Sequence, residues 1–202
     1  RPPVLTTDVP LPSAISGLAD VLASSSGLND YMTRRGEHAV VLGASMAGLL
    51  TARVLTEFYD RVNVVERDEL DDCPTPRRGV PQSRQPHALL ARCGQILEEL
   101  FPGIAGELVA AGAHEWCDGD LSRFNAHFGG HQLVRDGRLP NPSSLVNVFA
   151  SRSFLECHVR RRVHALPRVT MLDGHDVDAL TSSGGAVTGV QVTDRGNHET
   201  RD

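Results

Sequence analysis

The chain has 202 residues and a formal net charge of −5 at pH 7. The length allows one domain with a substantial core, and the negative charge argues against general nucleic-acid binding. No apolar run approaches the roughly 20 residues of a membrane-spanning helix.

The cysteines are far apart in the sequence and include no C-x-x-C pair: Cys73, Cys93, Cys117 and Cys157. No basic segment followed by a long apolar core marks a secretory leader. The pattern therefore predicts reduced thiols, no disulfide network and a cytoplasmic protein.

Residues 1–31 differ in composition from the rest of the chain. They contain four prolines and the polar run Ser24–Gly27, with only a weak helical patch from Ile15 to Leu22. We therefore expect a flexible N-terminal extension over 1–31, with the functional domain beginning near Met32.

A strand, a turn, a helix and a second strand are predicted between His38 and Glu66. The unbroken aliphatic run of Val40, Val41 and Leu42 is typical of a strand buried on both faces of a parallel sheet. A helix starts at Met46, and the four-residue steps of its apolar positions predict a buried face: Leu50, Val54 and Phe58. Residues 62–65 then form the second strand.

The turn of this unit has the chemistry of a dinucleotide site. Backbone N–H groups at a helix N-terminus attract a pyrophosphate, while Gly43 permits the turn and Gly48 a close approach of the helix. Ser45 stands where the usual fingerprint has a glycine. Glu66, 18 residues after Gly48, is suited to accept hydrogen bonds from ribose hydroxyls. The alternative is that the glycines only shape a tight turn.

Residues 67–86 form a long loop rich in charge and proline, followed by helices. His87 opens the first helix, whose predicted apolar face comprises Leu89, Cys93, Ile96, Leu97 and Leu100. Pro102 and Gly103 end it, and a shorter helix covers 104–111.

Beyond residue 112 the pattern changes to short strands. Residues 124–134 read as a hairpin around Gly129 and Gly130, and 144–150 as a strand. A helix follows from Arg152 to about Ala165, with Ser153 and Glu156 at the spacing of a capping box. Its predicted buried stripe is Leu155, Val159, Val163 and Leu166. Further strands are expected at 169–172, 177–180 and 187–192.

Other candidate sites are weaker. His127 and His131 have a metal-ligand spacing for a helix, but the glycines between them favour a hairpin with two surface histidines. The run Arg160–Arg162 is interpreted as a solvated helix face rather than a phosphate patch. His87 is interpreted equally well as a packing residue or as a residue facing a cofactor.

Together, residues 43–50, the Glu66–Asp68 strand end and the Gly79–His87 loop resemble FAD-dependent oxidoreductases of the aromatic-hydroxylase superfamily. This superfamily includes flavin monooxygenases and geranylgeranyl reductase-like proteins. The segment Ser151–Glu156 is similar to the family's step from a strand to a helix. The resemblance implies an α/β fold: a Rossmann-like FAD-binding domain with a parallel βαβ sheet, and the start of a small β-rich substrate segment.

The resemblance implies a set of cofactor-binding residues: Gly43, Ala44, Ser45, Met46, Ala47, Gly48, Glu66, Arg67, Arg78, Gln82, His87, Arg152 and Val177. Gly43, Ser45 and Gly48 would hold the pyrophosphate of FAD. Glu66 would bind the adenosine ribose, Arg152 the pyrophosphate or ribityl chain, and Val177 the adenine. The side chains expected towards the flavin are Arg78, Gln82 and His87. Catalytic residues are not assigned, and no metal is expected.

The implied activity is monooxygenase-type oxidation of a hydrophobic or aromatic organic substrate, with NAD(P)H and O₂ as co-substrates. The family's later motifs are not found after Val192, so the chain is expected to be an N-terminal portion. The predicted divisions are 1–31, the FAD-binding unit 32–112, a β-rich insertion 113–150 and a truncated return 151–202. The alternatives are a non-catalytic dinucleotide-binding fragment, a polyprenyl reductase-like flavoprotein and an NAD-dependent enzyme, although the chain has no lysine to serve the last.

Overall fold

The computed structural model describes residues 35–72 and 74–202. The extension predicted over 1–31 lies outside the described residues, as does Cys73. The helices are α3 (Met46–Leu55), α4 (Ala91–Leu100), α5 (Ile104–Ala110) and α6 (Arg152–His164), with the 3-10 helices η1 (Pro81–Arg84), η2 (Leu121–Arg123) and η3 (Pro142–Leu145). The longer strands are β1 (Gly36–Leu42), β2 (Tyr59–Val65), β7 (Asn147–Ser151), β9 (His175–Ser183) and β10 (Ala186–Asp194). The shorter ones are β3 (Pro86–Leu89), β4 (His114–Trp116), β5 (His127–Phe128), β6 (His131–Gln132), β8 (Val169–Leu172) and β11 (Thr200–Arg201).

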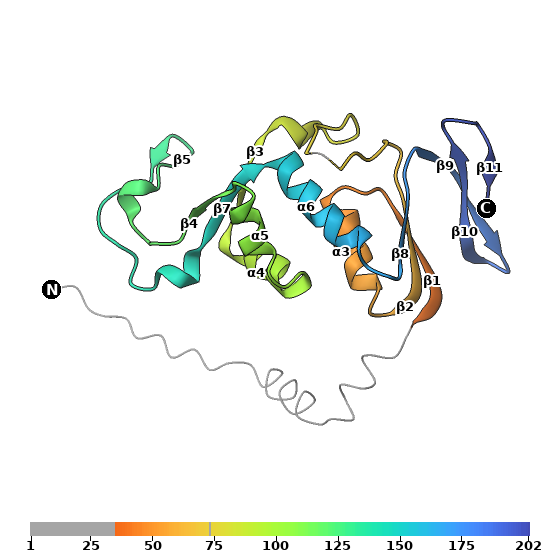
Figure 1. Ribbon diagram of the computed structural model, residues 1–202, viewed down its shortest axis with the longest axis horizontal. Helices are drawn as coiled ribbons and strands as arrows, with labels where there is room; N and C mark the ends of the chain where they lie inside the picture. Colours follow the sequence, from red (N-terminus) through yellow and green to blue (C-terminus); the bar gives the residue numbers. More distant parts are fainter. Residues whose placement is uncertain (1–34, 73) are drawn as a thin grey trace, which may run out of the picture.

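The strands β1, β2 and β8 form a parallel sheet in the order β1-β2-β8. Helices α3 and α6 pack together on one side of it, and the antiparallel sheet β11-β10-β9 lies on the other (Figure 1). The chain passes from β1 through α3 to β2, so the predicted βαβ unit is confirmed. The mixed α/β architecture with a parallel sheet is confirmed with it.

The expected burial of β1 on both faces is wrong. Val41 is buried beneath the helices, but Val40 is half-buried and Leu42 is about half exposed. Their face lines a cleft of about 740 Å³ between the parallel sheet and the β9–β10 hairpin. The hairpin packs on β2, and the open cleft beside β1 explains the exposure.

The predicted buried stripe of α3 is also wrong. Leu49 and Ala52 are fully buried, whereas Leu50 is half-buried and Val54 is exposed. Phe58 lies beyond the helix, which ends at Leu55. Positions three apart and four apart both share a helix face, so the spacing left two choices of face. The contact of Gly48 with the preceding turn determines which face is buried, and that face contains Leu49.

A second antiparallel sheet, of order β3-β7-β4, carries the chain into α6. His87 and Leu89 lie in β3 and not at the start of a helix, so both helical assignments are wrong. Pro86 pairs with Ser151, and the N–H of Arg152 donates to the carbonyl of Gln85. This pairing explains the extended backbone before α4, and it holds the Gly79–His87 loop beside the first turn of α6.

The predicted hairpin around Gly129 and Gly130 is confirmed as β5 and β6. His127 and His131 are exposed there. Among residues 35–72 and 74–202, no group of side chains is arranged to hold a metal ion. In the same part of the chain, no helix is long and apolar enough to cross a membrane.

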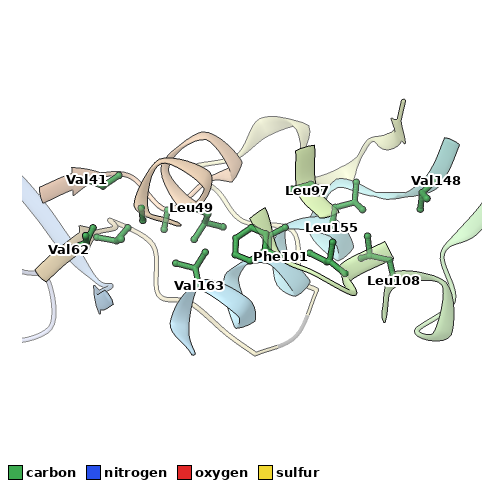
Figure 2. Close-up of a cluster of buried hydrophobic side chains, with 14 of the residues drawn as sticks. Val41, Leu49, Val62, Leu97, Phe101, Leu108, Val148, Leu155 and Val163 are labelled. Carbon is green, nitrogen blue, oxygen red and sulfur yellow. The ribbon is translucent and has the colours of Figure 1, made fainter. Parts of the chain in front are cut away.

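One hydrophobic core joins the parallel sheet, the helices α3, α4, α5 and α6, and β7 (Figure 2). The predicted stripe of α6 is confirmed for Leu155, Val159 and Val163, which are buried, while Leu166 is half-buried. The core residues labelled in Figure 2 are Val41, Leu49, Val62, Leu97, Phe101, Leu108, Val148, Leu155 and Val163. Leu97 is the buried residue of α4, whereas Cys93 and Ile96 are exposed.

The interpretation of Arg160–Arg162 as a solvated face is wrong for Arg160, whereas Arg161 is exposed and Arg162 is half-buried. Arg160 is buried and donates to the carbonyl of Asp71, and Arg161 donates to that of Asp72. Arg162 forms an ion pair with Glu107 of α5 at 2.7 Å. The long loop after β2 folds back over α6, so these arginines bind the loop and α5.

Replacing Gly48 tests the close contact between α3 and the turn. A Cβ at Gly48 would lie 1.8 Å from the carbonyl oxygen of Gly43, so backbone must move. We expect Gly48→Ala to lower the free energy of unfolding by about 3 kcal/mol, measured by urea denaturation.

Gly94→Ala is the matched control, because Gly94 lies within α4 and a Cβ there meets nothing within 4 Å. We expect it to raise stability by about 0.5–1 kcal/mol through the higher helix propensity of alanine. Equal stability of the two variants would contradict the proposed contact.

Candidate functional site

The site is built on the turn between β1 and α3. Gly43 has a φ of +97°, a conformation that side chains with a Cβ rarely adopt, and its N–H donates to the carbonyl of Val65 at 2.7 Å. The first bond within α3 runs from the N–H of Leu49 to the carbonyl of Ser45 at 2.9 Å. The N–H groups of residues 46–48 therefore have no acceptor within the helix. These donors and the positive end of the helix dipole point out of the turn.

Glu66 lies at the carboxyl end of β2 and is only 8% exposed. One carboxylate oxygen accepts the N–H of Ala44 at 2.7 Å, and the other accepts the N–H of Asp68 at 3.0 Å. Nη1 of Arg77 lies 3.3 Å from Oε2 of Glu66 and forms an ion pair with it. Burial by itself raises the pKa of Glu66, but the two backbone N–H groups and Arg77 outweigh it and hold the pKa below its ordinary value.

Arg77 is the most connected cation of the site, and its side chain is 6% exposed. It pairs with Glu156 at 2.5 Å and with Asp68 at 3.4 Å, in addition to Glu66. It also donates to the carbonyl of Ala44 at 3.1 Å. Burial lowers the pKa of Arg77, but the hydrogen bond and charge of Glu156 and the charge of Glu66 raise it overall.

Sequence reasoning missed three members of this network. It named Arg78 instead of Arg77, assigned Glu156 only to a capping box, and gave Asp68 no role in binding. Arg78 is exposed and lines the neighbouring cavity. Glu156 carried a usable signal, because it lies one helical turn after Arg152 and between the apolar positions of α6.

The predicted capping box at the start of α6 is wrong. Ser151 is the N-cap, and its side chain accepts the N–H of Phe154 at 3.2 Å. Ser153 is buried within the helix. The capping site precedes the predicted one by two residues because β7 runs up to Ser151. Glu156 is thereby turned towards Arg77 and not back towards the helix N-terminus.

Arg152 connects α6 to the turn. Its guanidinium donates to the hydroxyl of Ser45 at 3.1 Å, and its Nε lies 3.7 Å from Glu156. This Nε is buried without a hydrogen-bond partner. A buried, unsatisfied donor on a charged group is costly, so the site has unused capacity for an acceptor. The Ser45 hydroxyl lies between Arg152 and Glu156, 3.5 Å from the latter.

A polar cavity of about 620 Å³ opens beside these residues, at the carboxyl ends of β2 and β8. Ligands of parallel α/β sheets bind at such ends. Its lining residues are Arg67, Asp68, Glu69, Asp71, Thr75, Pro76, Arg77, Arg78, Asp173, Gly174, Asp194, Arg195 and Gly196.

The structure brings together some of the predicted site residues and not others. Residues 43–48, Glu66 and Arg152 meet at the turn, and Arg67 and Arg78 line the cavity. Gln82 is exposed in η1, and His87 is half-buried in β3. Val177 is 39% exposed on β9 and does not line the cavity.

Comparison with known proteins gives a curated relative and a set of similar structures. Protein Rv3254 of Mycobacterium tuberculosis is 41% identical over 136 residues, which are 67% of this chain and 28% of that protein. The chain thus spans about 28% of that relative's length. No protein-family model matches the chain.

PqsL of Pseudomonas aeruginosa, a probable FAD-dependent monooxygenase, aligns with a TM-score of 0.57 and 16% identity, over 82% of this chain and 40% of that one. The flavin-dependent monooxygenase PieE, whose structure contains FAD and substrate, aligns with a TM-score of 0.53 and 21% identity, over 83% and 28%. The chain therefore has the fold of the N-terminal portion of FAD-dependent monooxygenases, in agreement with the resemblance found in the sequence.

The network around Glu66 predicts a pH dependence of stability. The carboxylate is favoured in the folded state, so its contribution is fully present above the ordinary glutamate pKa and is lost as the pH falls through the lower folded-state pKa. We expect Glu66→Gln to be less stable than the unsubstituted chain at pH 7, with the gap closing in acid.

Thermal unfolding between pH 7 and pH 3 measures this gap. Glu99→Gln is the control, since Glu99 is exposed and pairs only with exposed Arg92. A gap that does not change with pH would contradict the assignment.

Proposed function

We propose that this chain binds FAD, with the AMP half on the β1-α3-β2 unit and the pyrophosphate at the turn. The observation that supports this most strongly is the Nε of Arg152, which is buried beside the N-terminus of α3 without a hydrogen-bond partner, although it forms an ion pair with Glu156 at 3.7 Å. A cation and a helix N-terminus that face one turn suit a diphosphate. Gly48, where a Cβ would clash, provides the close backbone approach that such a ligand needs.

The residues present fit this cofactor. The free N–H groups of residues 46–48 would hold phosphate oxygens, and Arg152 would supply a further donor and a positive charge. The Glu66 oxygen that accepts the N–H of Asp68 would also accept a ribose hydroxyl. Gln82, His87 and Val177, for which we propose roles in flavin and adenine binding, lie apart from the turn, in η1, β3 and β9.

For the whole protein we propose oxidoreductase activity of the flavin monooxygenase type. When bound, FAD would supply the redox chemistry, with NAD(P)H as reductant and O₂ as oxidant for a hydrophobic or aromatic substrate. The fold shared with PqsL and PieE supports this class. The chain's own residues would bind and orient the cofactor.

We also propose that residues 113–150 form a β-rich insertion, and that 151–202 return to the cofactor domain. Two strand pairings support this division. Strands β4 and β7 pair with each other, and the segment between them contains the β5–β6 hairpin. Strand β8 then pairs with β2 in the parallel sheet.

FAD binding is tested by incubating the 202-residue chain with FAD, desalting it and recording the visible spectrum. We expect retained flavin bands. In a fluorescence titration, Arg152→Gln should weaken FAD binding by about tenfold, because a charge-assisted hydrogen bond is lost.

Arg92→Gln is the matched control, because Arg92 is exposed on α4 and pairs only within that helix. It should bind FAD like the unsubstituted chain. A colourless protein after desalting, or equal affinities for Arg152→Gln and Arg92→Gln, would contradict the proposal.

A further inference from the structure

We propose that Glu156 is a positioning residue, which holds Arg77 and Arg152 in place around the nucleotide-binding turn. The inference rests on the proposed function, because the turn is taken as the pyrophosphate site. Glu156 itself does not line the cavity. It would act on the ligand only through the two arginines.

The geometry joins three distant parts of the chain at one carboxylate. Glu156 is 3% exposed, and its Oε1 accepts hydrogen bonds from Nε of Arg77 at 2.9 Å and from Nη2 at 2.5 Å. Its Oε2 lies 3.7 Å from Nε of Arg152 and 3.5 Å from the hydroxyl of Ser45. Nη1 of Arg160 lies 3.9 Å from Oε1, the oxygen that Arg77 also binds.

A buried carboxylate needs a reason at this position. Its neighbours Leu155 and Val159 are core residues, and an apolar side chain at 156 would avoid the desolvation of a charge. Arginine has many rotamers, and fixing one costs conformational entropy when a ligand binds. Glu156 fixes both guanidiniums before binding, so that this cost falls on folding and not on recognition.

The carboxylate also fixes where the two cations lie relative to the turn. Arg77 donates to the carbonyl of Ala44 and is bound at the same time by Glu156, Glu66 and Asp68. Arg152 reaches Ser45 from the same carboxylate. The two cations therefore approach the turn from the loop and from α6, with Glu156 as their common anchor.

The proposal predicts the sign of a substitution effect. Glu156→Gln removes a negative charge near the turn. If Glu156 acted only by neutralising the arginines, its removal would make the site bind an anion more tightly. A positioning residue gives the opposite result, because freed arginines bind less well. A purely structural residue would lower the thermal midpoint without changing the affinity of the folded protein.

The experiment is calorimetric titration of the 202-residue chain with ADP, which carries the ribose and pyrophosphate of FAD without the flavin. We expect Glu156→Gln to weaken ADP binding by about tenfold. Glu99→Gln, an exposed glutamate on α4, should bind like the unsubstituted chain. Circular dichroism at the titration temperature establishes that each variant is folded. Equal or tighter ADP binding by Glu156→Gln would overturn the proposal.

A double-mutant cycle tests whether Glu156 acts through Arg152. If it does, Arg152→Gln should weaken ADP binding less in the Glu156→Gln background than in the unsubstituted chain. Additive losses in the Arg152 cycle and in the corresponding cycle with Arg77→Gln would overturn the proposal.

The two proposals fail in different ways. ADP binding without FAD binding contradicts the flavin assignment alone, and the variants still decide the role of Glu156. If the unsubstituted chain does not bind ADP, the turn is no nucleotide site and the role of Glu156 is overturned with it.

Discussion

The approach of α3 to the end of β1 is the constraint on which the rest of the site depends. The Cα of Gly48 lies so close to the carbonyl of Gly43 that no other side chain fits, and the positive φ of Gly43 turns the chain into this position. The contact brings the free N–H groups of α3 to the carboxyl edge of the sheet. It also selects Leu49 and Ala52 as the buried face of the helix.

Several buried charged side chains surround this turn. Arg77 is surrounded by the carboxylates of Glu66, Asp68 and Glu156, while Arg152 keeps one donor unpaired. Buried ion pairs are weak evidence for stability, because desolvation offsets much of their attraction. Their concentration at the end of a parallel sheet is better explained by a polar ligand. The core beneath, from Leu49 to Val163, needs no such groups.

The loop after β2 has little regular structure, and contacts with distant parts of the chain fix its conformation. Arg160 and Arg161 of α6 bind its backbone carbonyls, and Asp173 after β8 accepts the N–H of Leu70 at 2.8 Å. These contacts join residues far apart in sequence. They bring Arg77 into contact with Glu66. The loop itself has no periodicity from which that position could be predicted.

The sequence by itself determined the βαβ unit, the glycine turn, Glu66 at the end of β2 and the apolar stripe of α6, because each depends on local periodicity or on the backbone needs of one residue. Through the resemblance it also singled out Arg152, at the start of a helix, as a candidate. Only the tertiary structure decided that Arg77 and not Arg78 enters the site, that Glu156 is buried and paired, and that Arg160 faces the loop. Side chains of identical chemistry differ there only in which neighbours surround them. The contacts that distinguish them, Arg77 with Glu156 and Arg160 with Asp71, join residues 79 and 89 positions apart, beyond the reach of any local pattern.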